Sequence, residues 1–194
     1  MCRAPQDWSS LKRSPRFGPK CAGCEVADVF YNAWEAVRPQ VQDALSKITY
    51  TSVFFTGHDM GGAIAALATY DMSVNHGAPL GRSYTFGQPR VGNKAFASEL
   101  NNLQLFRVTH HTDSVVHVPP RDKGYYHSGL EVFYKEHTCT AITEDGVFQP
   151  DCVDEVLCDP NDGEDSKGAN SVSASAYSYK EHDHYFGSNV RGSC

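Results

Sequence analysis

Residues 54–62 read Phe-Phe-Thr-Gly-His-Asp-Met-Gly-Gly, and no other stretch of the chain says as much about its fold. They follow a β-branched and aromatic run over residues 49–56, which predicts a buried strand. They precede residues 63–73, where alanine and leucine predominate and predict a helix. The glycines in residues 57–62 predict a tight turn between the two. The chain is therefore expected to pass from a strand through a sharp turn straight into a helix.

This layout, Gly-x-nucleophile-x-Gly between a strand and a helix, is that of a nucleophile elbow. Such a turn needs small residues two before and two after its centre, and Gly57 and Gly61 satisfy that need. Asp59 occupies the centre, above a helix N-terminus whose amides and dipole stabilise negative charge. The backbone N–H of Met60 would then donate to an oxyanion. A simpler interpretation is a glycine-rich turn in which Asp59 caps the helix.

Helices and strands alternate along the rest of the chain. Apolar residues at helical spacing predict a helix over residues 27–48, with a kink or break near Arg38 because Pro39 follows it. Further strands are expected at residues 83–86, 105–109 and 130–135, and a helix at residues 93–103. Strands that alternate with helices predict an α/β fold with a mostly parallel sheet.

Two late segments lack this regular pattern. Residues 136–175 are rich in Gly, Asn, Asp and Ser and include three cysteines, which predicts a long loop tied by a disulfide. Residues 177–186 are aromatic and rich in histidine, and we expect a loop leading into a short helix.

The composition is that of one soluble globular domain. The chain has 194 residues, 40% hydrophobic and 21% charged, which is enough to bury a core. The net charge of −6, without a basic stripe, argues against nucleic acid as the main partner. No apolar run approaches the roughly 18–20 residues that a membrane span needs.

Seven cysteines are many for a cytosolic chain of this length. We expect disulfides formed in an oxidising compartment, with Cys21 and Cys24 as a close pair and one thiol left over. Cys139, Cys152 and Cys158 cluster late in the chain. Zinc binding is an alternative, but a second close ligand pair is missing. A redox-active pair is a weaker one, because Cys21 is not expected at a strand-to-helix junction.

An ordered set of motifs resembles the fungal class 3 lipases and the related feruloyl esterases. The elbow, Thr56-Gly-His-x-Met-Gly-Gly-Ala63, is one, and Phe86-Gly-Gln-Pro-Arg-Val-Gly-Asn93 is nearly a family signature by itself. The others are Cys21-Ala-Gly-Cys24 with Phe30 and Trp34, Arg107 to Asp113 with Pro119-Pro120, His127-Ser128 ahead of Glu131, and His182-Asp-His-Tyr-Phe-Gly187. The resemblance extends from about residue 21 to the end of the chain.

The resemblance implies an α/β-hydrolase core that hydrolyses esters through an acyl-enzyme. Carried over by position, Asp59 stands at the nucleophile, Asp113 at the triad acid and His182 at the general base. Members of the family are secreted, single-domain and free of cofactors. We therefore expect a secreted monomer without a cofactor, with a small-molecule or lipid ester as substrate and contact with a lipid interface.

Two departures from the family pattern bear on activity. Asp59 replaces the serine, and a carboxylate has no hydroxyl proton to give to His182. Loss of the serine alone removes roughly 10⁶-fold of the rate in a serine hydrolase. Family members also have an upstream segment with the first strands, an oxyanion-hole hydroxyl and the lid, so we expect a core without those strands. Residues 1–20 are expected to be an irregular segment with Asp7-Trp8 as a lid remnant, and residues 21–194 the lipase-like domain.

Three alternatives remain open. The sequence Gly-His-Asp-x-Gly-Gly also resembles the elbow of haloalkane dehalogenases and epoxide hydrolases, which use an aspartate nucleophile and histidine-activated water. The chain could instead be a catalytically inactive pseudoenzyme, a fragment or an engineered variant. A metal could bind at His110, His111 and Asp113, or at His182 with His184, but nothing else supports one and we expect none.

Overall fold

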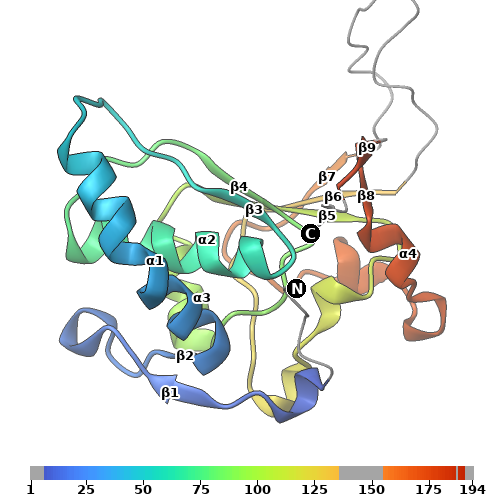
Figure 1. Ribbon diagram of the computed structural model, residues 1–194. Helices are drawn as coiled ribbons and strands as arrows, with labels where there is room; N and C mark the ends of the chain where they lie inside the picture. Colours follow the sequence, from blue (N-terminus) through green and yellow to red (C-terminus); the bar gives the residue numbers. More distant parts are fainter. Residues whose placement is uncertain (1–6, 136–154, 187, 191–194) are drawn as a thin grey trace, which may run out of the picture.

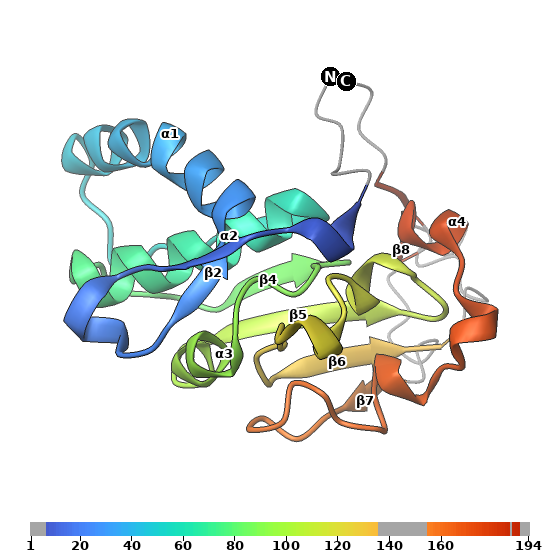
Figure 2. The same cartoon turned by 90° about the horizontal axis from the view of Figure 1, so that it is seen from below.

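A five-stranded sheet forms the centre of the computed structural model, which describes residues 7–135, 155–186 and 188–190. The strands are β3 (Thr56–His58), β4 (Ser83–Phe86), β5 (Leu105–His110), β6 (Glu131–Tyr134) and β7 (Glu155–Leu157), in that spatial order. The first four are parallel and β7 is antiparallel to β6. Figure 2 shows β4 to β7 side by side. The prediction of a mostly parallel sheet is confirmed.

Helices α1 (Asp28–Ser46), α2 (Met60–Tyr70) and α3 (Lys94–Leu100) pack on one side of this sheet (Figure 1). Small residues such as Gly62, Ala63 and Ala66 let α2 approach the strands closely, and both alanines are fully buried. The core between the helices and the sheet also holds large side chains, among them Phe30, Trp34, Leu67, Tyr70 and Phe96. The predicted helices at residues 63–73 and 93–103 are confirmed, each with shifted ends.

Helix α1 does not break at proline. Pro39 lies inside α1, and the helix continues to Ser46, so of the predicted kink or break near Arg38 the break is wrong. Pro39 is exposed, so water can reach the Glu35 carbonyl that a proline cannot bond. Burial of Phe30 and Trp34 fixes the preceding turns against the core.

The predicted buried strand over residues 49–56 is wrong in both position and burial. Strand β3 begins only at Thr56, and upstream of it Val53 makes an isolated bridge to Leu80. Phe54 is 64% exposed. Among the described strands β3 lies at the edge of the sheet, so its outer side has no neighbour that could bury it.

The N-terminal segment is more regular than predicted. Strand β1 (Arg13–Pro15) pairs antiparallel with β2 (Glu25–Ala27). Between them a disulfide joins Cys21 and Cys24, as the cysteine pattern predicts. Trp8 packs against the core cluster. Whether residue 20 is a domain boundary stays a prediction.

The C-terminal segment contains the predicted short helix, α4 (Tyr179–His182). Two short strands follow it, β8 (His184–Tyr185) and β9 (Ser188–Asn189). Single helical turns connect the elements: 3-10 turns at Trp8–Ser10, Gly18–Cys21, Val115–His117, Arg121–Lys123, Ala169–Ser171 and Ala174–Ala176, and a π-helical turn at Asp71–Asn75. Cys158 carries a free, buried thiol, so the expected disulfide does not include it; Cys139 and Cys152 lie outside the described residues.

Candidate functional site

The elbow holds Asp59 in a strained backbone conformation. Strand β3 ends at His58 and α2 begins at Met60, which leaves Asp59 alone between them with φ 55° and ψ −127°. A non-glycine residue with positive φ is uncommon and is kept only where the surrounding structure enforces it. The Asp59 side chain makes no capping hydrogen bond to α2, so the helix-cap interpretation is wrong.

Two backbone contacts and a close glycine approach fix this turn. The Asp59 amide donates to the Phe86 carbonyl at 3.1 Å, and its own carbonyl accepts from the Gly62 amide at 3.0 Å. A Cβ atom on Gly57 would clash with the Gly61 carbonyl, so Gly57 has to be glycine. A Cβ atom on Gly61 would meet nothing within 4 Å, so the need for a small residue applies to only one of the two predicted positions.

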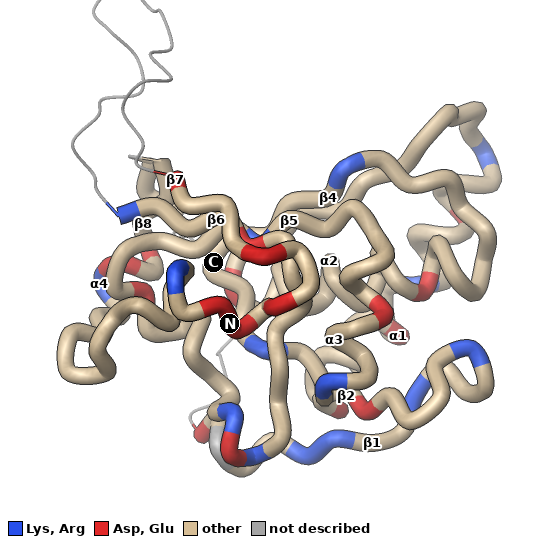
Figure 3. Tube along the Cα trace, turned by 180° about the vertical axis from the view of Figure 1, so that it is seen from behind, with Lys and Arg blue, Asp and Glu red and all other residues tan. Residues whose placement is uncertain are grey.

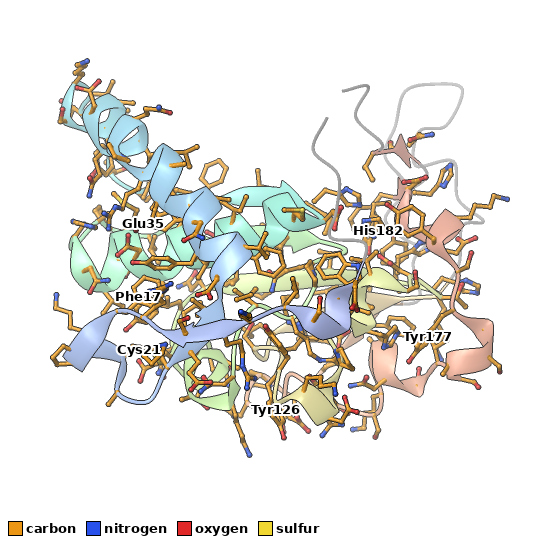
Figure 4. The ribbon with its side chains drawn as sticks, turned by 60° about the horizontal axis from the view of Figure 1, so that its bottom comes forward. Phe17, Cys21, Glu35, Tyr126, Tyr177 and His182 are labelled. Atoms are coloured by element: carbon orange, nitrogen blue, oxygen red, sulfur yellow. A yellow bond between two sulfur atoms is a disulfide. The ribbon has the colours of Figure 1, made fainter. Side chains whose placement is uncertain are left out.

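The acid and the histidine meet from different parts of the chain. Asp113 follows β5 and His182 ends α4, and the His182 Nδ1 lies 2.9 Å from the Asp113 Oδ2. Asp113 also accepts hydrogen bonds from the Tyr185 hydroxyl at 2.6 Å and from the Val115 amide at 2.8 Å. Figure 4 shows His182 near α4, on the opposite side of the view from Cys21.

The three predicted triad positions lie together. The His182 Nε2 is 3.8 Å from the Asp59 Oδ1, which is close enough for an ion pair and too long for a hydrogen bond. Within the described part of the chain, neither of these two buried atoms has a hydrogen-bond partner. The imidazole is thus held from its Nδ1 side and faces Asp59 with its free nitrogen.

These two carboxylates set the charge of His182. Burial alone would lower the pKa of this imidazole, but the hydrogen bond to Asp113 and the negative charges of Asp113 and Asp59 raise it from 6.5 to about 9. Since 3.8 Å excludes a hydrogen bond, Asp59 acts on His182 through its charge. His182 is therefore an imidazolium at neutral pH and has no free lone pair on the Nε2.

Met60 opens α2, so its backbone N–H is among the helix donors that lack an intrahelical acceptor. This places a donor and the positive end of the helix dipole beside Asp59, where the sequence predicts an oxyanion donor. The role itself stays a prediction.

Three residues of the site were not found from the sequence. A Cβ atom on Gly87, which has φ +55°, would lie 2.7 Å from the His182 Cε1 and 2.9 Å from the Asp113 Oδ2. Tyr185 donates to Asp113 from the residues that follow the histidine. His58 completes the set. Each lies inside a quoted family motif, so their position in those motifs was the available signal.

His58 supports the histidine from behind. Its Nε2 lies 2.8 Å from the His182 carbonyl oxygen, and since a carbonyl only accepts, His58 must carry a proton on that nitrogen. The two imidazole rings stack with centroids 4.3 Å apart. Burial, followed by the charge of His182, lowers the pKa of His58, so it stays neutral at neutral pH.

Other kinds of site find little support. Among the described residues, no group of three or more His, Cys, Asp or Glu side chains could hold a metal ion. The basic side chains along β1 (Figure 3) are paired: Arg13 with Glu25 at 3.5 Å and Arg16 with Asp28 at 2.8 Å. No helix in the described ranges is both long and apolar enough to cross a membrane.

The family follows from a comparison with known sequences. Residues 4–123, more than half of the chain, match the family described as lipase (class 3). The chain belongs to the class 3 lipase family. The ordered motifs, the parallel sheet and the elbow agree with this membership.

Individual relatives add detail. A secreted mono- and diacylglycerol lipase of Fusarium solani is 35% identical over 144 residues, which cover 68% of this chain and 43% of that protein. A lipase crystal structure from Rhizopus microsporus var. chinensis has a TM-score of 0.73 at 30% identity and covers 92% of this chain and 59% of its own. A triacylglycerol lipase whose catalytic centre is described as a serine protease triad has a TM-score of 0.71 at 28% identity, with coverages of 92% and 64%. The chain spans less than half the length of the curated relatives it matches.

Proposed function

We propose that this chain has the ester-hydrolysing site of a class 3 lipase, and that Asp59 impairs its turnover. The observation that carries the proposal is the arrangement of Asp59, His182 and Asp113, with the imidazole bound to the acid at 2.9 Å and facing the elbow at 3.8 Å. A nucleophile, a base and an orienting carboxylate in this order form the acyl-transfer triad. Membership of the lipase family supports an ester as the substrate.

Asp59 opposes acyl transfer in three ways. It has no hydroxyl proton, so the usual alkoxide-like attack cannot begin. Its charge holds His182 in the imidazolium form, so the general base is already protonated at neutral pH. Its carboxylate also lies beside the Met60 amide, where an oxyanion would have to form.

The direct test is the variant Asp59→Ser, assayed with p-nitrophenyl butyrate at pH 7.5. A serine restores the proton donor and removes the charge, so we expect kcat/KM to rise at least about 10³-fold over the unmodified chain. The double variant Asp59→Ser, His182→Gln is the matched control and should lose this gain. If a folded Asp59→Ser chain shows no gain, the ester-hydrolase proposal is wrong and an inactive pseudoenzyme or fragment is the better account.

The wider setting is proposed on the same basis. The disulfide between Cys21 and Cys24 and the secreted relative support secretion. The relatives are named as lipases, which supports lipid or other small esters as substrates. We also propose that the chain is a monomer and that it contacts a lipid interface. We also propose that residues 21–194 form the hydrolase domain.

A further inference from the structure

We propose that the unmodified site hydrolyses esters of acidic alcohols, such as phenols, with Asp59 itself as the nucleophile, and leaves ordinary alkyl esters intact. This inference rests on the proposed function, because it assumes that an ester carbonyl enters the same site. It is carried by a carboxylate oxygen that has no hydrogen-bond partner among the described residues and by the imidazole that lies 3.8 Å from it.

One oxygen of the Asp59 carboxylate makes no hydrogen bond within the described part of the chain, although the side chain as a whole is 24% exposed. Asp59 does not cap α2, and its buried Oδ1 has no hydrogen-bond partner among the described residues. The charged neighbour of this oxygen is the His182 imidazole at 3.8 Å, which offers an ion pair but no hydrogen bond that would have to break before attack. The elbow backbone, with φ 55°, fixes the direction in which this oxygen points.

The imidazole is placed to protonate a leaving group. During attack the leaving oxygen shares one carbon atom with the attacking Oδ1, so a nitrogen 3.8 Å from that Oδ1 can reach it. Asp113 holds the opposite nitrogen at 2.9 Å, which keeps the ring in place. His182 is already charged at neutral pH, so it can donate without first taking up a proton.

The steps balance with water as the only co-reactant. Asp59 Oδ1 forms a bond to the ester carbonyl carbon, whose oxygen takes up the π electrons beside the Met60 amide. When this intermediate collapses, the bond to the leaving oxygen breaks and His182 gives that oxygen a proton. A mixed anhydride and a neutral imidazole remain. His182 then takes a proton from water as the resulting hydroxide attacks the anhydride, which releases the acid and restores the Asp59 carboxylate and the imidazolium.

Competition between two leaving groups sets the substrate class. The tetrahedral intermediate can expel either the carboxylate of Asp59 or the alcohol oxygen, and a carboxylate is in general a much weaker base than a phenoxide or an alkoxide. Phenols have a pKa of about 10, as in tyrosine, whereas alkyl alcohols lie near the value of about 15.7 for water. Because the weaker base leaves more readily, most intermediates return to the starting ester, but the fraction that goes on to products rises steeply as the alcohol becomes more acidic, so phenyl esters react far more often than alkyl esters.

The experiment compares phenyl butyrate with ethyl butyrate, using the unmodified chain, Asp59→Asn and Asp59→Ser. We expect the unmodified chain to hydrolyse phenyl butyrate at least about 10-fold faster than Asp59→Asn, and ethyl butyrate no faster than that control. Asp59→Ser should hydrolyse both. Equal rates of phenyl butyrate hydrolysis in the unmodified chain and in Asp59→Asn would overturn the inference. So would a ratio of ethyl to phenyl butyrate hydrolysis that is the same in the unmodified chain as in Asp59→Ser. An inactive but folded Asp59→Ser chain overturns the proposed function instead.

A pH profile separates this route from direct attack by water. Donation by the His182 imidazolium predicts that phenyl ester hydrolysis falls as the pH rises through about 9. If neutral His182 activated water directly, the rate would rise over the same interval. The side chains that contact His182 are Asp59, Asp113, His58 and Tyr179, and Tyr185 acts through its hydrogen bond to Asp113. The pKa of His58 is lowered and that of Tyr185 is raised, both chiefly by burial, so neither moves toward this interval.

Discussion

The two halves of the site differ in burial and in hydrogen bonding. In the acid–histidine half, Asp113 is fully buried, His182 is 1% exposed, and the acid accepts three hydrogen bonds. In the elbow half, the Asp59 side chain is 24% exposed and one of its oxygens has no partner among the described residues. Because no contact within the first half depends on Asp59, residue 59 can change without moving the acid or the histidine. The predictions below test this independence.

The largest effect is expected at the acid. In an Asp59→Ser background, Asp113→Asn should lower kcat by about 10⁴-fold, because an amide cannot hold the imidazole in the tautomer that accepts a proton. Steady-state kinetics with p-nitrophenyl butyrate measure this loss. A loss smaller than 10-fold, with the fold intact by circular dichroism, would mean that the acid–histidine half does not act as a unit.

Gly87 is the next most sensitive position. In the same background, Gly87→Ala forces a Cβ atom against the His182 ring at a positive φ, so we expect kcat to fall about 10²-fold. The free energy of unfolding should drop by about 1–3 kcal/mol.

The matched control is Gly61→Ala, where a Cβ atom has open space within helix α2. Its free energy of unfolding should stay equal or rise by about 0.5–1 kcal/mol, with little change in kcat. If the two alanine variants behaved alike, the difference in steric demand between Gly87 and Gly61 would be wrong. Urea unfolding and kinetics measure both variants.

Removal of one hydroxyl tests the support of the acid. Tyr185→Phe deletes the donor that lies 2.6 Å from the Asp113 Oδ2. We expect the free energy of unfolding to fall by about 1.5–3 kcal/mol, as for other hydrogen bonds to a charged group. Thermal unfolding of Tyr185→Phe is compared with that of the unmodified chain. An unchanged midpoint would show that the hydrogen bond does not stabilise the fold.

The pH dependence of stability links the two halves. The pKa of His182 is about 9 in the folded chain and 6.5 in the unfolded chain. Its protonation therefore stabilises the fold fully below pH 6.5, and this contribution is lost as the pH rises toward 9. The whole contribution is on the order of 3 kcal/mol. Asp59→Asn should flatten the decline between pH 6.5 and 9 in urea unfolding, and an identical decline in both chains would contradict a charge effect of Asp59.

Local signals explain why much of the fold could be predicted. Strand β4, helix α2 and the elbow have short-range signatures in branched, alanine-rich and glycine residues, and all three are present. The prediction of a buried strand over residues 49–56 is wrong because β-propensity does not reveal whether a neighbouring strand exists. Among the described strands, β3 lies at the edge of the sheet. The predicted break near Arg38 is wrong because proline removes one hydrogen bond, and the buried Phe30 and Trp34 hold the rest of the helix against the core.

The position of the motifs in the sequence predicts the three triad residues, but it does not predict whether they are protonated or charged. The charge of His182 depends on the 3.8 Å between its Nε2 and the Asp59 Oδ1, residues that are far apart in the chain. The same holds for the hydroxyl of Tyr185 on Asp113, and for Cys158, since the sequence predicts one unpaired thiol without saying which cysteine carries it. Such long-range contacts have no local signature in the sequence.

Asp113 and Asp59 together raise the pKa of His182, and the part due to Asp59 is what separates this site from one with a serine. Nuclear magnetic resonance titration of the histidine ring signals tests it directly, with the His182 signal assigned by its loss in His182→Gln. The account predicts an apparent pKa of about 9 for His182 in the unmodified chain and a clearly lower value in Asp59→Ser. If His182 were neutral at pH 7.5 in the unmodified chain, or had the same pKa in both chains, the claim would be wrong.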